Sequence, residues 1–310
     1  MKHLLVGIIL GGLLAAGCAA GPPAAPPEPA PNRAARKLLQ QALDQYQRGC
    51  DAAALEYFHR AHELFSLTDQ AGQVAACLNN IGNIHRRSGQ TDTALRFFTE
   101  AERIFRQTED TDGVAQALSN RAATLLTDGR LAAAAVLLDE AISLVPDRGA
   151  LTARIRNHQA ILLMRQGKDG AAETELRRAA GLVSPRDGAA FAAVNASLGR
   201  LLLATGRPEE ARECFEKAYR ADRERENYPA LAADLAALAE ACQALGQPDQ
   251  AFDYLARSVK LQALTGQARA ARSQLETLSR LAAETDRDIT LIRRFVEHWL
   301  AGEMHLDYCR

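Results

Sequence analysis

The chain has 310 residues, of which 47% are apolar but only 5% aromatic, and its 37 basic side chains nearly balance 38 acidic ones. This length allows one solenoid with a continuous core, and the many small apolar side chains suit helices that pack through Ala and Leu. The formal net charge of −1 argues against a nucleic acid as partner.

The N-terminus has the features of an export signal. An uncharged run, Leu4–Leu14, follows a basic start and is too short to span a bilayer comfortably. The next residues, Ala15-Ala16-Gly17-Cys18, resemble the lipobox of bacterial lipoproteins, although Ala15 stands where leucine is usual. The resemblance implies that signal peptidase II removes residues 1–17 and that Cys18 carries lipid.

The lipid and the residues after it predict a location in the bacterial cell envelope. Ala19 follows Cys18 at the position where aspartate favours retention in the inner membrane, so we expect the periplasmic face of the outer membrane. Several acyl chains, palmitate among them, would make this anchor durable. Residues 18–32 contain six of the eleven prolines, which predicts an extended tether between the lipid and the folded part.

From residue 33 onward one pattern repeats six times. A glycine recurs every 38 to 40 residues, as Gly49, Gly89, Gly129, Gly167, Gly206 and Gly246. Alanine follows each glycine after five residues, and a large apolar residue follows four further on, as Phe58, Phe98, Leu138, Leu176, Phe215 and Leu255. Such a period indicates a stack of short helical hairpins.

The stretch Leu78–Phe105 shows how one hairpin is built. Apolar residues line one face of a helix before Gly89 and one face of a second helix after it. Gly82 is small, so the two backbones approach closely and Phe98 fills the adjoining space. This spacing resembles the tetratricopeptide repeat family, and most closely its ~40-residue variants such as those of kinesin light chains. The resemblance implies an all-α, right-handed α-solenoid of six repeats over residues 33–266.

Residues 267–310 are expected to cap the stack, because the end of a solenoid needs a polar outer face. The helical period continues over Ala268–Glu284, and a shorter helix is predicted at Asp288–Leu300. We expect Trp299 to pack the last hairpin and not to form an exposed anchor for a partner.

The cysteines were considered as disulfides, because an oxidising envelope permits them. Beyond Cys18 five cysteines remain, an odd number that leaves at least one thiol unpaired within the chain. Cys50 and Cys77 are expected at opposite ends of a hairpin, too far apart to pair. Cys242 occupies an apolar core position. The redox state of all five stays open.

The sequence shows no catalytic or metal-binding motif. The chain lacks GxSxG, HExxH and the phosphate-binding glycine motifs, so we expect a protein that is not an enzyme and holds no cofactor or metal. His85 stands in a core position, and we expect a packed ring with a satisfied polar tip. His59 and His62 share a helical face, but the sequence offers no third ligand.

Polar side chains flank the apolar stripe on the first helix of each hairpin, which lines the concave side in the resembling family. They are Asn79, Asn83, Arg86, Arg87, Asn120, Arg154, Asn157, His158, Arg165 and Arg200. Asparagine offers a donor and an acceptor to a peptide backbone, and arginine holds a carboxylate with two hydrogen bonds. In that family such residues often hold an extended peptide or its terminal carboxylate. The alternative is that these polar residues only keep the concave side soluble.

Three function classes remain. The first is a scaffold that binds an extended segment of another envelope protein in its groove, through acidic residues or a free C-terminal carboxylate. The second is a structural subunit of an envelope, pilus or secretion assembly that uses its convex or end surfaces. The third, an enzyme of unrecognised type, has no motif in its favour.

Overall fold

The computed structural model describes residues 29–302 and residue 309. The predicted signal segment 1–17, the lipidation at Cys18 and the tether as far as residue 28 lie outside the described residues, so they stay predictions.

Residues 29–302 form fourteen α-helices and one short 3-10 helix, without any strand. The helices are α1 (Ala30–Arg48), α2 (Asp51–Leu67), α3 (Ala71–Arg87), α4 (Thr91–Gln107), α5 (Thr111–Thr127), α6 (Leu131–Ser143), α7 (Gly149–Arg165), α8 (Asp169–Gly181), η1 (Pro185–Asp187), α9 (Gly188–Ala204), α10 (Pro208–Glu224), α11 (Tyr228–Ala244), α12 (Pro248–Leu264), α13 (Ala268–Glu284) and α14 (Thr290–Leu300).

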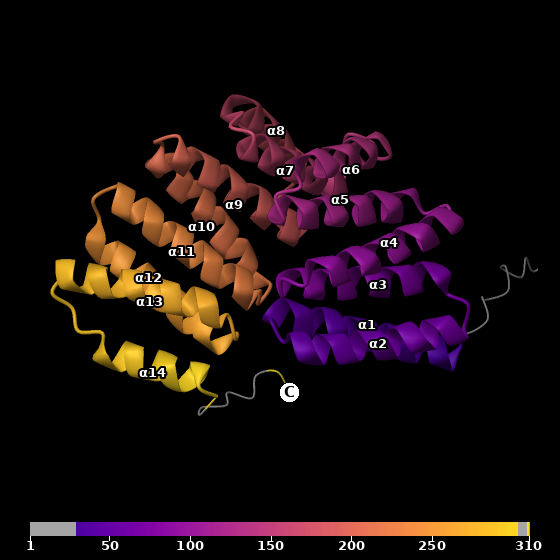
Figure 1. The fold of residues 1–310 in the computed structure, drawn as a ribbon, viewed down its shortest axis with the longest axis horizontal. Coiled ribbons are helices and arrows are strands. Elements are labelled where there is room, and N and C mark those ends of the chain that lie inside the picture. Colours follow the sequence, from indigo (N-terminus) through magenta and orange to yellow (C-terminus); the bar gives the residue numbers. More distant parts are fainter. Residues whose placement is uncertain (1–28, 303–308, 310) are drawn as a thin grey trace, which may run out of the picture.

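Helices α1 to α12 pack as six consecutive hairpins, which confirms the α-solenoid (Figure 1). The repeated glycine ends the first helix of each hairpin with a positive φ between 70° and 88°. Glycine adopts this left-handed conformation without the penalty that a Cβ imposes, so the chain reverses at the same place in every repeat. The large apolar residue after it is buried in all six hairpins.

Close helix contact within a hairpin depends on the small residues predicted for it. A Cβ added to Gly82 of α3 would lie 2.7 Å from the ring of Phe98 on α4. Gly199 of α9 and Phe215 of α10 repeat this arrangement, with a corresponding distance of 2.6 Å. Both phenylalanines are fully buried, so ring and glycine together fill the space between the two helices.

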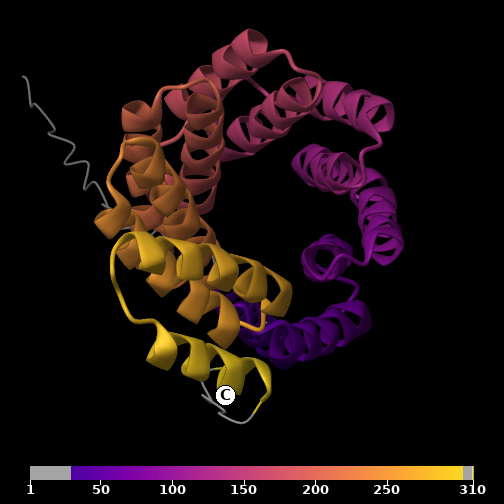
Figure 2. The ribbon, with the colours of Figure 1, turned by 60° about the vertical axis from the view of Figure 1, so that its left-hand side comes forward.

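The stack curves until its beginning meets its later repeats, as the indigo and orange helices of Figure 2 show. Helix α1 contacts α11 directly. At the tip of the first hairpin, Arg48 forms an ion pair of 2.9 Å with Glu226, in the turn before α11. The neighbouring Gly49 lies against Pro229, whose Cγ would be 2.8 Å from a Cβ at that position. The six repeats therefore enclose a central space.

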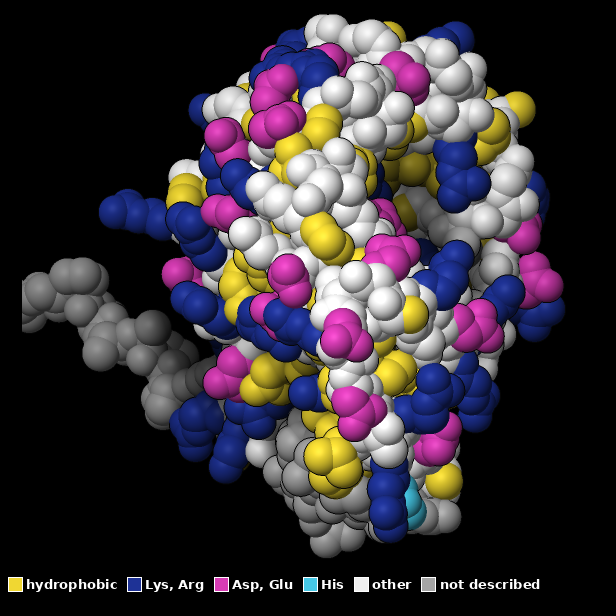
Figure 3. Space-filling model, turned by 90° about the vertical axis from the view of Figure 1, so that its left-hand side faces the viewer, with side chains coloured by type: hydrophobic (Ala, Val, Ile, Leu, Met, Phe, Trp, Pro, Cys, Tyr) yellow, Lys and Arg dark blue, Asp and Glu magenta, His cyan; other side chains and the backbone are white. Residues whose placement is uncertain are grey.

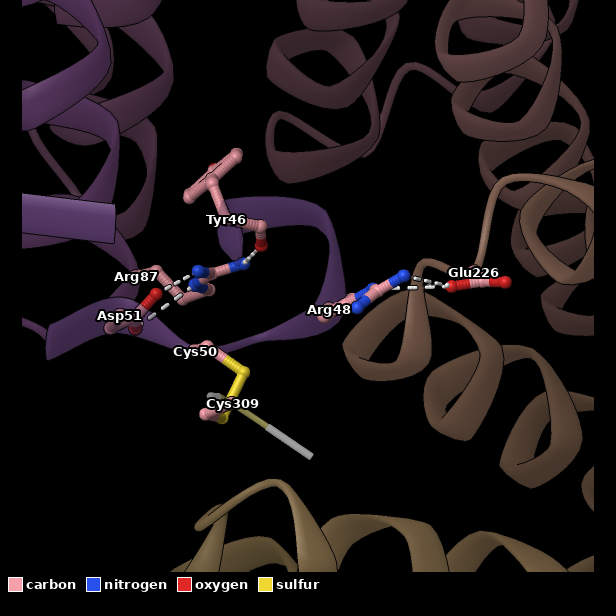
Figure 4. Close-up of a disulfide and its surroundings, with 7 residues drawn as sticks. All are labelled: Tyr46, Arg48, Cys50, Asp51, Arg87, Glu226 and Cys309. Atoms are coloured by element: carbon pink, nitrogen blue, oxygen red, sulfur yellow. Dashed lines mark hydrogen bonds and ion pairs between the residues drawn. A yellow bond between two sulfur atoms is a disulfide. The ribbon is translucent and has the colours of Figure 1, made fainter. Parts of the chain in front are cut away.

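A disulfide also joins the two ends of the fold. Cys50, at the tip of the first hairpin, is bonded to Cys309, with a Cα–Cα distance of 5.4 Å (Figure 4). The other described cysteines, Cys77, Cys214 and Cys242, are free and buried. Burial alone raises the pKa of Cys77 to about 12, so this thiol is a packing residue. Cys242 is fully buried, as its apolar position predicted.

The C-terminal helices cover the last repeat. Helix α13 has the predicted bounds, and α14 begins at Thr290. Trp299 packs against the core around α12 and α13 and stacks on Phe295 with ring centroids 5.8 Å apart, which confirms its expected role. His85 also behaves as expected, since it stacks on Phe97 and its Nδ1 lies 2.6 Å from Gln90 Oε1.

The fold begins earlier than expected. Helix α1 starts at Ala30, so the last three residues of the predicted tether are helical. Pro31 is compatible with this start, because proline is tolerated in the first turn, where its missing N–H is not needed. Among the described residues, no helix combines the length and apolar character that crossing a membrane requires.

Candidate functional site

The central space contains a cavity of about 510 Å³, within the usual range for binding pockets. Side chains from α1, α3, α7, α9, α10 and α11 line it, together with the turn between α10 and α11. Its polar lining residues are Tyr46, Gln47, Asn80, Arg87, Asn157, Ser197, Arg200, Asp222, Arg225, Asn227 and Asp234. Because α1 lies opposite α9 and α11, curvature of the whole stack creates this cavity.

Two of the predicted asparagines bind each other. Asn120 Nδ2 of α5 donates a 2.9 Å hydrogen bond to Asn79 Oδ1 of α3, and Asn79 is only 1% exposed. The pair uses these polar atoms to join two repeats, and contact of Asn79 with a peptide stays a prediction. Asn80, one position further on, lines the cavity instead.

Arg87 is also committed within the fold. It forms an ion pair with Asp51 of α2, donates to the Tyr46 carbonyl oxygen at 3.0 Å, and lies 4.0 Å above the Tyr46 ring centroid (Figure 4). These contacts tie α3 to the first hairpin. Asp51 already supplies Arg87 with one carboxylate, and because Arg87 also lines the cavity, its contact with a carboxylate of a partner stays a prediction.

Arg86 of α3 and Arg154 of α7 form a basic cluster around His158. Its Nδ1 is joined to Ser119 Oγ of α5 by a 2.8 Å hydrogen bond. Burial first, and then the guanidinium groups of Arg86 and Arg154, lower the pKa of His158 to about 3, so the ring is neutral near pH 7. Arg86 donates a long 3.4 Å bond to Asn83, and its buried Nε has no partner. This cluster retains hydrogen-bonding capacity for an anion.

The other residues predicted to bind a peptide lie at different places relative to the cavity. Asn157 is 5% exposed, lines the cavity, and its Oδ1 has no hydrogen-bond partner. Arg200 lines the cavity with an exposed side chain. Arg165 is exposed at the C-terminal end of α7 and is not among the cavity residues. The cavity thus brings Asn157 and Arg200 together. Its lining residues do not include Arg86, Arg154, His158 or Arg165.

Two buried carboxylates face the cavity from α10 and α11. Asp222 and Asp234 are each 4% exposed. The pKa of Asp234 rises to about 8, because burial, and then the nearby Asp222 carboxylate, disfavour its charged form more than Arg200 favours it. Burial also raises the pKa of Asp222, opposed by hydrogen bonds from Asn227 and Arg225. A cation placed here would relieve the cost of ionising them.

Comparison with known families identifies the repeats. Two family models described as tetratricopeptide repeat match the chain, one over residues 33–107 and 190–263 and the other over residues 115–140. Together they cover more than half of the sequence. The chain belongs to the tetratricopeptide repeat (TPR) family. The search of curated proteins found no match.

Solved structures of other proteins are similar to this fold. A Rap protein complexed with competence and sporulation factor has a TM-score of 0.56 at 14% identity, covering 81% of this chain and 75% of its own. The Rap conjugation gene regulator of plasmid pLS20, in complex with the Phr* peptide, has a TM-score of 0.58 at 16% identity, covering 86% and 72%. A thermophilic TPR protein of Thermus thermophilus has a TM-score of 0.49 at 21% identity, covering 66% and 99%. At these identities the likeness concerns the fold.

The acidic pair of this TPR protein was missed by sequence reasoning. A signal was present, because Asp234 interrupts the first half of α11, where its neighbours are Ala and Leu. A carboxylate on such a face calls for a partner or a function. Asp222, by contrast, belongs to a second helix rich in charge, and nothing in its spacing separates it from solvent-facing residues.

The face of the TPR stack that Figure 3 shows gives no comparable signal. On the face shown in Figure 3, acidic and basic side chains are interspersed, with hydrophobic ones between them. A mixed surface of this kind is ordinary for a protein in water and does not select a partner by charge. The cavity is therefore the stronger candidate for a binding site.

Proposed function

We propose that this TPR protein is a non-catalytic scaffold that binds an extended peptide segment of a partner protein in its central cavity. The observation that carries the proposal is Asn157, which lines the cavity and whose buried Oδ1 has no hydrogen-bond partner. A buried polar atom left unpaired costs roughly 1–3 kcal/mol, and a backbone N–H of a bound peptide would satisfy it.

The basic cluster supports a carboxylate on the same peptide. Arg154 lies one helical turn before Asn157 on α7, so the two side chains are neighbours on one face. Arg86 approaches the same cluster from α3 and has an unpartnered Nε. The cluster would receive an acidic side chain or the C-terminal carboxylate of the segment. One of the two similar Rap proteins is complexed with competence and sporulation factor and the other with the Phr* peptide, which supports a peptide as the ligand.

We further propose that the protein works in the bacterial envelope, held by lipid on Cys18, with its partner there. The lipobox resemblance carries this part, and the Cys50–Cys309 disulfide supports it, because disulfides persist in oxidising compartments. Replacing Cys18 with serine should abolish labelling of the protein by radioactive palmitate. A mature N-terminus beyond Cys18 without lipid would overturn the anchor.

Site-specific crosslinking in cells tests the cavity. A photo-crosslinking amino acid replaces Ala193, an exposed cavity residue, and in a matched control it replaces Val136, which is 67% exposed on α6. We expect one protein to be captured from Ala193 and not from Val136. A peptide of its crosslinked segment is then titrated by calorimetry.

Calorimetry decides between the cavity and another surface. Removing a buried charged partner costs roughly 2–5 kcal/mol of binding, so Arg154→Ala should weaken the peptide at least tenfold. Arg103→Ala, which removes an exposed side chain from α4, should leave the affinity unchanged. Equal affinities for both variants would exclude the basic cluster from the binding site.

The structural-subunit alternative has one observation in its favour. Leu291 and Phe295 lie four residues apart on α14 and are 66% and 44% exposed, which forms an apolar strip at the end of the stack. Capture from residue 291 together with none from residue 193 would favour this second function.

A further inference from the structure

On the side of the cavity formed by α10 and α11, only one of two buried aspartates has its hydrogen-bond partners. Asp222 Oδ1 accepts hydrogen bonds from Asn227 Nδ2 at 3.0 Å and from Arg225 Nη1 at 3.2 Å. Asp234 is equally buried, yet its Oδ2 has no hydrogen-bond partner. Burying a carboxylate without hydrogen-bond partners is costly. The burial of Asp234 therefore lowers the stability of the fold.

The neighbouring arginine does not satisfy Asp234. Arg200 of α9 is near enough to act on it electrostatically, but its own side chain is exposed and no ion pair joins the two. Arg225 is bonded to Asp222. Two carboxylates therefore share this side of the cavity. The charged hydrogen bond from Arg225 reaches Asp222 and not Asp234.

A second unpartnered acceptor lies across the same cavity. Asn157 of α7 is 5% exposed, and its Oδ1 is without a hydrogen-bond partner. Asn157 and Asp234 come from different repeats and line one cavity of about 510 Å³. An N–H donor of a ligand would satisfy Asn157 Oδ1, and it would satisfy Asp234 Oδ2 in the ionised form of that carboxyl group, which a positive charge favours.

We propose that Asp234, supported by Asp222, binds a positively charged nitrogen of the peptide, either its N-terminal ammonium or a Lys or Arg side chain. This inference rests on the proposed peptide-binding function and assigns a charge to one end of the ligand. Charge-assisted hydrogen bonds to a carboxylate are short and roughly twice as strong as neutral ones, so one such contact selects cationic peptides. Asn157 then accepts a backbone N–H.

The two charged regions also give the bound peptide a direction. The Arg86 and Arg154 cluster lies on α3 and α7, whereas Asp222 and Asp234 lie on α10 and α11. A peptide with its cationic group at Asp234 therefore extends with a carboxylate toward α7. This refines the expectation of an acidic partner to a segment that carries both charges.

A divalent metal ion is a weaker occupant for the acidic pair. Calcium takes six to eight oxygen ligands, and magnesium usually needs carboxylates together with substrate phosphates. Across residues 29–302 and 309 no group of three or more His, Cys, Asp and Glu side chains is arranged to hold a metal. An ammonium or guanidinium group needs only the acceptors that are present.

Four pools of random hexapeptides test the proposal with the immobilised protein. The pools contain either one lysine or norleucine in its place, and either a free or an acetylated N-terminus. Mass spectrometry measures the retained peptides. We expect at least tenfold enrichment of a cationic pool over the acetylated norleucine pool. Enrichment of free N-termini without lysine assigns the N-terminal ammonium, and enrichment of acetylated lysine peptides assigns the side chain.

Matched variants assign the preference to Asp234. Asp234→Asn, which keeps the shape of the side chain, should abolish the tenfold preference while uncharged peptides are still retained. Glu240→Gln removes an exposed carboxylate from the same helix and should keep the preference. A wild type that retains peptides without regard to charge, or an Asp234→Asn variant that keeps the preference, overturns the inference. A wild type that retains no pool overturns the proposed peptide binding itself. A concentration of 1 mM calcium chloride is about the dissociation constant of the weakest calcium sites. Loss of the preference for cationic peptides on adding it would instead assign the acidic pair to a metal.

Discussion

At the scale of single residues, glycine decides how closely the helices of a repeat approach. Gly82→Ala should lower the free energy of unfolding by about 1–3 kcal/mol, because its new Cβ would lie 2.7 Å from the Phe98 ring in a filled core. Gly170→Ala on α8 is the matched control, since nothing lies within 4 Å of its Cβ. Alanine there should be neutral or stabilise the helix by up to ~1 kcal/mol. Urea unfolding that shows equal losses for both variants would contradict the packing role of Gly82.

The buried acid at position 234 predicts how stability depends on pH. The pKa of Asp234 is about 8 in the folded protein, against an ordinary value of 3.8, because burial and Asp222 outweigh Arg200. Between these two values the folded chain keeps a proton that the unfolded chain has lost. The free energy of unfolding should therefore decrease as the pH rises through this window.

Asp234→Asn should flatten that decrease, and the variant should be more stable than the wild type near the upper end of the window. Urea unfolding at several pH values measures the slope for both proteins. Asp139→Asn, an exposed change on α6, is the control and should leave the slope as it is. An unchanged slope in Asp234→Asn would show that this carboxylate is not the source.

At the scale of helices and repeats, local pattern explains why so much of the fold was predictable. The glycine, alanine and large apolar residue of each hairpin lie close together in the sequence, so their spacing carries the geometry of the hairpin directly. The spacing determines less well the direction in which a polar side chain points around its helix. Asn79 and Asn80 differ by one position, yet the first is buried against Asn120 and the second faces the cavity.

The C-terminal cap tests whether repeats depend mainly on their neighbours. Val296 of α14 is fully buried, so Val296→Ala should cost about 1–3 kcal/mol and should raise hydrogen exchange first in α12, α13 and α14. Phe295→Ala changes the adjacent, 44% exposed position and should have a smaller effect. Equal loss of protection in α3 and α13 would contradict nearest-neighbour stability.

At the scale of the whole molecule, closure of the stack could not be predicted from spacing alone. Each repeat adds a small rotation, and only their sum decides whether α1 reaches α11. The contacts that record closure join residues far apart in sequence, such as Arg48 with Glu226, which are 178 positions apart. No periodicity relates such residues, so neither the enclosed cavity nor its acidic side followed from the sequence.

The covalent link between the ends of the stack makes closure testable. Cys50 and Cys309 are 259 residues apart, and a disulfide that closes a long loop restricts the unfolded chain strongly. Reduction should therefore lower the free energy of unfolding by about 2–4 kcal/mol. The exposed Arg48–Glu226 ion pair is too weak to replace the link, since such pairs contribute at most about 1 kcal/mol.

Cys309→Ser separates this effect from other consequences of a reductant. The variant should unfold at the lower urea concentration of the reduced wild type, and adding reductant should not shift it further. Cys77, Cys214 and Cys242 are buried free thiols, so reduction has nothing to break at these positions. Because the link ties the first hairpin to the C-terminal end, hydrogen exchange should rise on reduction at α1 and α2 as well as at α14. A wild type whose unfolding is the same with and without reductant would show that non-covalent contacts alone close the stack.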